Sequence, residues 1–236
     1  MKMYSNWWYG FWGIFLSAYM RMYLKLRYRF THPLPEGPRI FAVNHPTVWD
    51  AFPLLIHRAT RYLSVMVEEQ IWSFPLPRFI FSTANQIKLF NIDKSRVEES
   101  IHDALQILNM GRSVLISPEG GRTSPDEDVR GKKGVIRLAL EANVPIVPVG
   151  VWIPQDKVKQ QRVNYNYQGR KYFDIAPIPR FRAPYGVVFG EPLSIKDSFT
   201  DTSSFNECQS LADKLLQRIY KLSEEAKKMF PEYRKK

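Results

Sequence analysis

A histidine and an aspartate lie five positions apart in the segment NHPTVWD, residues 44–50. Side chains on a regular helix meet at spacings of three or four, so His45 and Asp50 can meet only if one of them stands off the helix. Pro46 favours this geometry, because a residue before proline is pushed toward extended conformations. A carboxylate that binds one ring nitrogen fixes the tautomer of a histidine and leaves the other nitrogen as a base. The pair therefore predicts a general base with its orienting acid, and a substrate hydroxyl as the nucleophile.

Two other interpretations of this pair stay open on the spacing alone. A histidine at the end of a strand is often structural, and His45 with Asp50 is also a fragment of a metal site. Zinc needs three or four ligands, and only these two cluster locally, so we expect no metal.

A second loop, SPEGGRT at residues 117–123, offers groups for an anion. Gly120 and Gly121 allow backbone N–H groups to approach a phosphate, and Arg122 offers a bidentate fork. We expect Glu119 to bind a substrate hydroxyl or to hold the arginine. A tight glycine turn with a surface arginine is the alternative.

The composition is that of a basic globular protein. Hydrophobic residues make up 44%, and 34 Lys and Arg against 23 Asp and Glu give a net charge of +11. Such a surface favours a polyanionic partner, and charge alone does not choose among nucleic acid, acidic lipid and a phosphorylated substrate. The run GKKG at residues 131–134, with Lys132 and Lys133, adds to this charge or forms a solvated turn. The single cysteine, Cys208, excludes an internal disulfide framework and is expected to be an inert thiol.

Apolar segments of strand length alternate with amphipathic helical segments from residue 39 onward, which predicts an α/β fold with a mainly parallel central sheet covered by helices. Ligands gather at the carboxyl ends of strands in such sheets, where both loops above belong. The polar residues 155–182 are expected to form an excursion or hairpin. The expected strands are 39–43, 62–67, 87–92, 113–116, 144–151 and 187–189, and the expected helices are 50–60, 95–110, 134–142 and 203–228.

The N-terminus has a different composition. Residues 3–20 carry no charge, contain three of the six tryptophans, and are followed by several arginines and lysines. Trp and Tyr prefer the headgroup level of a bilayer, so we predict a membrane-associating aromatic helix at 1–30 that lies in the interface, and one domain at 31–236. A helix packed on the core and a single span are the alternatives. Residues 71–80 are expected to add a second apolar contact, to line an apolar tunnel or to pack in the core.

Together and in this order, the motifs resemble those of the lysophosphatidic acid acyltransferase family, within the glycerol-3-phosphate acyltransferase superfamily. The similarity covers roughly residues 38–195. It rests on four segments: His45-x4-Asp50 with the preceding Asn44, similar to the first block of the family; PEGGRT at 118–123, similar to the third block, Pro-Glu-Gly-Thr-Arg-Ser; 144–149, similar to the fourth; and GEPL at 190–193, similar to a late signature.

The resemblance implies an O-acyltransferase with a glycerolipid acyltransferase-like fold and no covalent acyl-enzyme. His45 would take the proton from an acceptor hydroxyl that attacks the thioester of acyl-CoA or acyl-carrier protein, and Asp50 would stabilise the imidazolium. Arg122 and Lys94 would hold the acceptor phosphate, with Lys133 assisting. No metal or bound cofactor is implied. The implied partners are a membrane lipid surface, a lysophospholipid and the acyl donor, with no nucleic acid, and the implied location is a membrane, with monotopic or peripheral attachment on the cytoplasmic side.

Two departures from the family pattern concern the acceptor. Lys94 stands where the second block, residues 85–95, usually ends in arginine, and lysine keeps the charge but loses the bidentate fork. Gly121 replaces the usual threonine and removes a hydroxyl donor. Lysophosphatidic acid, giving phosphatidic acid, is the expected acceptor. Another lysolipid or an amine-lipid is the alternative within the class, and a non-catalytic basic membrane-binding module is the alternative from another class.

Overall fold

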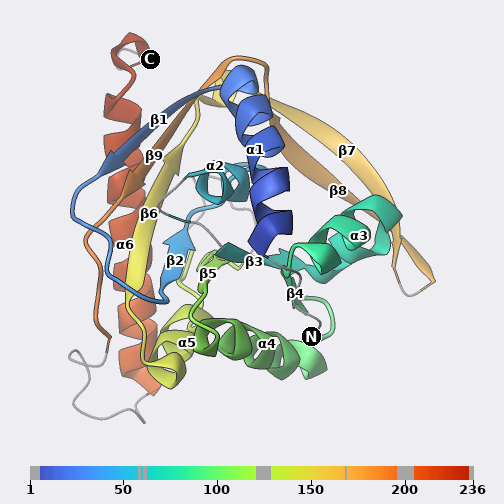
Figure 1. Ribbon diagram of the computed structural model, residues 1–236, viewed down its shortest axis with the longest axis vertical. Helices are drawn as coiled ribbons and strands as arrows, with labels where there is room; N and C mark the ends of the chain where they lie inside the picture. Colours follow the sequence, from blue (N-terminus) through green and yellow to red (C-terminus); the bar gives the residue numbers. More distant parts are fainter. Residues whose placement is uncertain are drawn as a thin grey trace.

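The computed structural model of the chain describes residues 6–57, 60, 63–120, 129–167, 169–195 and 205–233, and for 6–14, 205 and 206 it describes the backbone alone. A seven-stranded sheet runs through the molecule (Figure 1) in the order β1-β9-β6-β2-β5-β3-β4. From β6 to β4 neighbouring strands are parallel, whereas β9 pairs antiparallel with β6 and parallel with β1. The strands are β1 (Leu24–Phe30), β2 (Ile40–Val43), β3 (Leu63–Glu68), β4 (Ile87–Leu89), β5 (Ser113–Ile116), β6 (Ile146–Trp152) and β9 (Ala183–Phe189).

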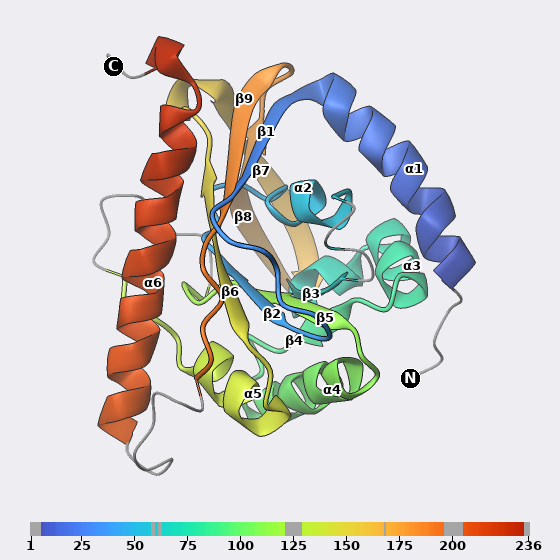
Figure 2. The ribbon, with the colours of Figure 1, turned by 60° about the vertical axis from the view of Figure 1, so that its left-hand side comes forward.

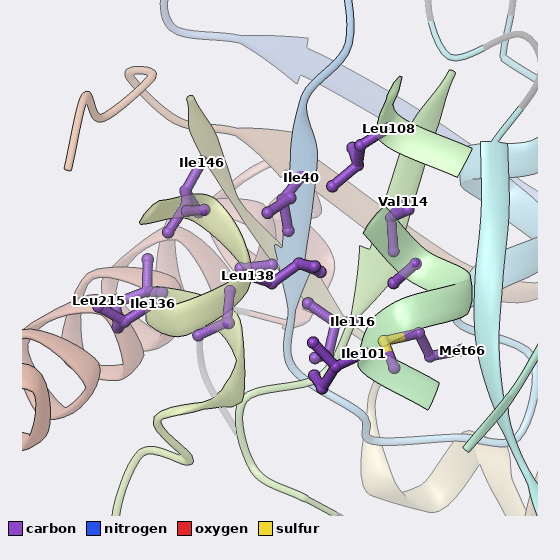
Figure 3. Packing of buried hydrophobic residues seen from close by; sticks show 14 of the residues in the cluster. Ile40, Met66, Ile101, Leu108, Val114, Ile116, Ile136, Leu138, Ile146 and Leu215 are labelled. Atoms are coloured by element: carbon purple, nitrogen blue, oxygen red, sulfur yellow. The ribbon is translucent and has the colours of Figure 1, made fainter. Parts of the chain in front are cut away.

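Helices cover both faces of the sheet, and α6 and α1 lie on opposite sides of it (Figure 2). One apolar core joins alternate strand residues to three helices, as Ile40, Val114, Ile136 and Leu215 illustrate (Figure 3). The other core joins the opposite strand residues to α1 and α2. The helices are α1 (Asn6–Tyr23), α2 (Ala51–Leu55), α3 (Pro75–Thr83), α4 (Val97–Asn109), α5 (Gly134–Ala142) and α6 (Phe205–Lys228), with 3-10 turns η2 (Glu69–Ser73) and η3 (Lys94–Arg96).

The predicted α/β architecture with a mainly parallel sheet is confirmed. The strand at 113–116 and the helix at 134–142 have the predicted bounds. The helix expected at 50–60 is shorter, because α2 ends at Leu55. The hydroxyl of Thr60 bonds to the carbonyl of Leu54 in the last turn of α2 and to that of His57 beyond it, so it satisfies one of the terminal acceptors of the helix.

The N-terminal helix is also shorter than the predicted segment 1–30. It ends at Tyr23, and residues 24–30 form β1, paired in register with β9. The sequence LKLRYRF alternates apolar and basic residues with the period of two that a strand requires, so its apolar side chains face the sheet's core. The predicted division at residue 30 therefore falls after a strand of the central sheet.

The described part of α1 has one packed side and one exposed side. Met20 is buried, and the ring of Tyr23 lies 4.8 Å from that of Trp49. Phe15, Tyr19 and Met22 are exposed. Across the described residues, no helix combines the length and apolar character needed to cross a membrane.

Two further segments flank the carboxyl edge of the sheet. The region expected as a hairpin forms β7 (Val158–Tyr167) and β8 (Arg170–Pro179), a separate two-stranded ribbon. The backbone N–H of Val48 donates to Pro177 O at its base (3.0 Å), and the hydroxyl of Tyr167 donates to Glu69 near its tip. Within residues 71–80, Leu76, Phe79 and Ile80 are exposed on α3, so core packing is wrong for these three side chains.

Candidate active site

The candidate site lies where the parallel strands end. His45 follows β2, Glu119 follows the neighbouring strand β5, and Lys94 follows β4. The carboxyl ends of parallel strands share one edge of a sheet, so all three residues belong to the same edge. The fold therefore brings the two predicted loops next to each other, because β2 and β5 are hydrogen-bonded neighbours.

His45 and Asp50 form the predicted pair. The ring nitrogen Nδ1 of His45 lies 2.8 Å from Oδ2 of Asp50. His45 stands on the turn after β2, and Asp50 is the residue before α2, so the histidine stays off the helical path. The His45 side chain is 28% exposed, whereas that of Asp50 is 1% exposed. A histidine that donates Nδ1–H to a buried carboxylate carries its basic lone pair on Nε2.

The carboxylate of Asp50 is held from four directions. Oδ2 accepts from His45 and from the backbone N–H of Thr47 (2.9 Å), and Oδ1 accepts from the Thr47 hydroxyl (2.7 Å) and from the Tyr185 hydroxyl. Burial first, and then the charge of Asp50, raise the pKa of the Tyr185 phenol well above its usual value, so this group stays a donor. Four donors satisfy the hydrogen-bonding capacity of this buried carboxylate and fix its orientation.

The backbone of His45 is fixed as well. Its N–H donates to Oε2 of Glu119 (2.8 Å), which links the two predicted loops directly. The preceding Asn44 is buried, and its amide exchanges two hydrogen bonds with the backbone of Val151 in β6 (2.9 and 2.7 Å). Burial raises the pKa of the Glu119 carboxyl above 4.5, against the opposing effect of the hydrogen bonds from His45 and Tyr220. Glu119 therefore positions His45, a role that the sequence did not assign to it.

The glycine turn of the second loop closes on a lysine. Gly120 has φ +73°, and a Cβ there would lie 2.7 Å from the side chain of Lys132. The backbone N–H of Lys132 donates to Pro118 O, and Gly131 is held on α6 by Asp213. The lysine against the turn is thus Lys132, whereas the predicted Lys133 is the residue directly before α5.

The remaining predicted residues are placed less closely. Lys94 is exposed in η3, and β4 is three strands from β2, which corresponds to about 14 Å between their ends. Arg96 is held by Glu99 (2.7 Å) and by the ring of Phe90. The predicted phosphate ligands Gly121 and Arg122 lie outside the described residues.

Two residues that complete the site, Thr47 and Tyr185, were not assigned a role from the sequence, and Lys132 was predicted only as part of a charged run. Thr47 lies inside the first motif, where a hydroxyl three residues before an aspartate is an available signal. Lys132 is adjacent to the predicted lysine. Tyr185 is 135 positions from Asp50, and no local pattern relates them. Across the described residues, no group of three or more His, Cys, Asp or Glu side chains gathers in a way that could hold a metal ion.

Several known proteins are similar to this chain in sequence or in fold. A 1-acyl-sn-glycerol-3-phosphate acyltransferase of Limnanthes alba is 28% identical over 111 residues, which is 47% of this chain and 39% of that protein. One of Cocos nucifera is 32% identical over 113 residues, 47% of this chain and 36% of that protein. The chain thus spans about two fifths of the length of these relatives. The crystal structure of the 1-acyl-sn-glycerophosphate (LPA) acyltransferase PlsC of Thermotoga maritima matches 93% of this chain and 78% of that chain, with a TM-score of 0.60 and 19% identity, which indicates a shared fold.

A family model described as Acyltransferase matches residues 25–152, more than half of the 236 residues. The matched segment starts within β1 and includes His45, Asp50 and Glu119. The resemblance predicted from the motifs is confirmed by this match and by the relatives above. The chain belongs to the acyltransferase family.

Proposed function

We propose that the protein transfers a fatty acyl group from a thioester donor to the free hydroxyl of a lysophospholipid, with lysophosphatidic acid as the acceptor and phosphatidic acid as the product. The observation that carries this proposal is the pair at the carboxyl edge of the sheet. A partly exposed histidine binds a buried aspartate that four donors hold in place. The names of the matched relatives, all 1-acyl-sn-glycerol-3-phosphate acyltransferases, support the acceptor.

In the proposed mechanism, Nε2 of His45 accepts the proton of the acceptor hydroxyl as its oxygen attacks the thioester carbonyl. The carbon–oxygen bond forms and the carbonyl oxygen becomes an oxyanion. When the oxyanion collapses, the carbon–sulfur bond breaks, and the leaving thiolate receives the proton from Nε2 of His45. Asp50 stabilises the imidazolium between these steps, and Glu119 keeps the ring in place through the His45 backbone. Lys94, Arg122, Lys132 and Lys133 supply positive charge for the acceptor phosphate.

The test is thiol release from acyl-CoA, and from acyl-carrier protein, in the presence of lysophosphatidic acid. We expect His45→Ala to lower kcat by about 10³-fold, since a positioned general base contributes 10²–10⁴-fold. His102→Ala is the matched control, because His102 is exposed on α4, where its ring nitrogen Nε2 is hydrogen-bonded to the Gln106 amide. Equal activity of the His45 and His102 variants would show that His45 is not the general base. If no thiol is released with any lysolipid acceptor and either donor, the proposed acyltransferase activity is wrong.

A panel of acceptors tests the acceptor itself. Lysophosphatidic acid, a neutral lysolipid and an amine-lipid are compared at equal surface concentration. The lysine at position 94 is a single charge without a fork, so an acceptor with a larger or zwitterionic headgroup is the second candidate. If a lysolipid with a different headgroup gives the highest kcat/KM, that lipid replaces lysophosphatidic acid as the proposed acceptor. The proposed general-base mechanism is unaffected.

We also propose that the protein is membrane-associated through α1. Exposed Phe15 and Met22 lie on this helix, and basic residues follow it. Deleting residues 1–30 would remove β1 as well, so point variants are the better test. We expect Phe15→Glu with Met22→Glu to leave the protein in the soluble fraction when it is centrifuged with anionic vesicles. Met110→Glu, an exposed apolar residue after α4 on the other side of the sheet, serves as the control. Unchanged sedimentation of the double variant would exclude this role for α1.

A further inference from the structure

Glu69 is a buried carboxylate that holds a second loop at the carboxyl edge of the sheet. It follows β3 directly and is 1% exposed. The backbone N–H groups of Ile92 (2.5 Å) and Asp93 (2.9 Å) donate to its Oε1, and the hydroxyl of Tyr167 donates to its Oε2. A carboxylate is costly to bury unless donors satisfy it, and these three donors do so. We call Glu69 with these three partners the Glu69 anchor.

The anchored loop is the one that carries Lys94. Asp93 accepts from the Ser95 N–H (3.3 Å) and hydroxyl (2.6 Å), so it caps the turn η3 in which Lys94 lies. Earlier in the loop, the backbone N–H of Phe90 donates to Oγ of Ser100 in α4 (3.0 Å). The backbone is thus held on both sides of Lys94, whereas the Lys94 side chain is exposed. A fixed backbone limits the positions that the ammonium group can reach.

Tyr167 connects this loop to the ribbon β7–β8. It is the last residue of β7, at the far end of the ribbon from Pro177, whose carbonyl accepts from the N–H of Val48. Burial first, and then the hydrogen bond to Glu69, raise the pKa of the Tyr167 phenol to about 12, so the group stays a donor at neutral pH. The ribbon is therefore bound at one end to the segment between the catalytic pair, and at the other end to the loop that carries Lys94.

We propose that Glu69, together with Tyr167, positions Lys94 for the phosphate of the acceptor. The inference rests on the proposed acyl transfer, in which Lys94 binds that phosphate. Binding is weakened by the ordering of loops and side chains that it requires, and a loop that is held in advance keeps this cost low. Loss of the anchor should therefore weaken acceptor binding and leave the chemical step at His45 unchanged.

Steady-state kinetics with lysophosphatidic acid as the varied substrate test the anchor. We expect Tyr167→Phe to raise the KM for the acceptor about threefold and Glu69→Leu about fivefold, with kcat changed less than twofold. Glu69→Gln should keep the KM within twofold of the wild type, because an amide oxygen still accepts from both backbone N–H groups. If Glu69→Leu does not fold, Tyr167→Phe alone decides.

Tyr172→Phe is the matched control for Tyr167→Phe. Tyr172 is opposite Tyr165 in the ribbon, and their rings stack at 5.6 Å. Tyr165 is two residues from Tyr167 on the same strand, so the control removes a hydroxyl from the same face. Its KM should equal that of the wild type. If the wild type is active and Tyr167→Phe has the KM of this control, the inference is overturned and the proposed function stands.

A double variant shows whether the anchor acts through Lys94. Once Lys94 is replaced by alanine, Tyr167→Phe should have no further effect, so the KM of the double variant should equal that of Lys94→Ala. A role of Tyr167 in the fold alone would multiply the two effects on the KM. Multiplied effects would therefore overturn the inference.

A binding measurement gives an answer even if no acyl transfer is found. Titration calorimetry with a short-chain, water-soluble lysophosphatidic acid is carried out on the wild type, Tyr167→Phe and Tyr172→Phe. We expect the Kd to be about threefold higher for Tyr167→Phe and unchanged for Tyr172→Phe. This result without thiol release would overturn the proposed acyl transfer and still support the anchor. Absence of binding to the wild type, or equal affinity of all three proteins, would contradict the inference.

Discussion

His45 and Lys94 follow two strands of the same sheet at the same edge, yet they are held in opposite ways. His45 is fixed through its ring by Asp50 and through its backbone by Glu119. Lys94 is exposed in a short 3-10 turn. In the proposed mechanism, this contrast separates a base that is oriented before substrate arrives from a cation that the substrate must orient. Damage to the first region should therefore lower kcat, and damage to the second should raise the KM for the acceptor.

The largest effect is expected from Asp50→Asn. An amide cannot stabilise an imidazolium, and its NH2 group would face donors that now point at a carboxylate. We expect kcat to fall about 10³-fold with little change in the KM for lysophosphatidic acid. Steady-state kinetics over a range of acceptor concentrations provide the measurement. A variant that loses acceptor affinity instead would show that the two regions are not separate.

Lys94→Ala tests the other side of the comparison. Loss of one charged hydrogen bond to a phosphate should raise the KM for lysophosphatidic acid about tenfold and change kcat less than twofold. Lys214→Ala, an exposed lysine on α6, controls for the loss of one positive charge. An equal rise in KM for both variants would assign the effect to overall charge.

Tyr185→Phe tests how much one hydrogen bond to Asp50 contributes to the first region, without removing a charge. Asp50 would lose one of its four donors and keep the other three. We expect kcat to fall about fivefold and the free energy of unfolding to fall by about 1–2 kcal/mol, as for the loss of one buried hydrogen bond to a charged group. Urea denaturation and kinetics on the same preparation give both values. If stability falls while kcat stays the same, Tyr185 supports the fold alone.

Glu119→Gln is expected to have the smallest effect, and this effect is on the free energy of unfolding. The pKa of Glu119 is raised above 4.5 in the folded protein, so the folded state binds this proton more tightly than the unfolded chain does. Stability at this position is therefore lost as pH rises from 4.5 through the folded pKa. Glutamine does not titrate and can still accept from the His45 N–H. The variant should gain stability relative to the wild type between pH 4 and pH 7 in urea denaturation. An unchanged difference across that range would show that burial of Glu119 carries no cost.

The elements that the sequence predicted best are those whose apolar residues coincide with the buried core. The run SVLI at β5 and the helix Gly134–Ala142 are apolar where the core is, so local pattern and packing agree. The pairing of β1 with β9 was missed although LKLRYRF alternates clearly, because the uncharged segment before it favoured one continuous helix. An edge strand depends on a partner 159 positions away, as Leu24 and Ala183 show, and no local signal supplies that partner.

In the site, too, the contacts between residues close in sequence were predicted and those between distant residues were not. His45 and Asp50 could be paired from sequence because five residues and a proline limit how they meet. Glu119 was predicted as a substrate ligand, and its bond to the His45 backbone depends on β2 and β5 being neighbours. Tyr185 lies on a strand that runs antiparallel to β6, and its hydroxyl reaches Asp50 only once the sheet is formed. Contacts of this kind follow from the order of strands, which residue types do not encode locally.

The direct junction between α1 and β1 has a consequence for substrate reach. α1 ends at Tyr23 and β1 begins at Leu24, so no flexible linker separates the helix from the sheet. Tyr23 also packs on Trp49, the residue before Asp50. If α1 lies on a bilayer, the depth of His45 relative to the lipid headgroups is set by rigid packing. The protein would then select acceptors whose free hydroxyl lies at the depth of His45. This depth is measured along the bilayer normal, from the boundary between the headgroups and the acyl chains.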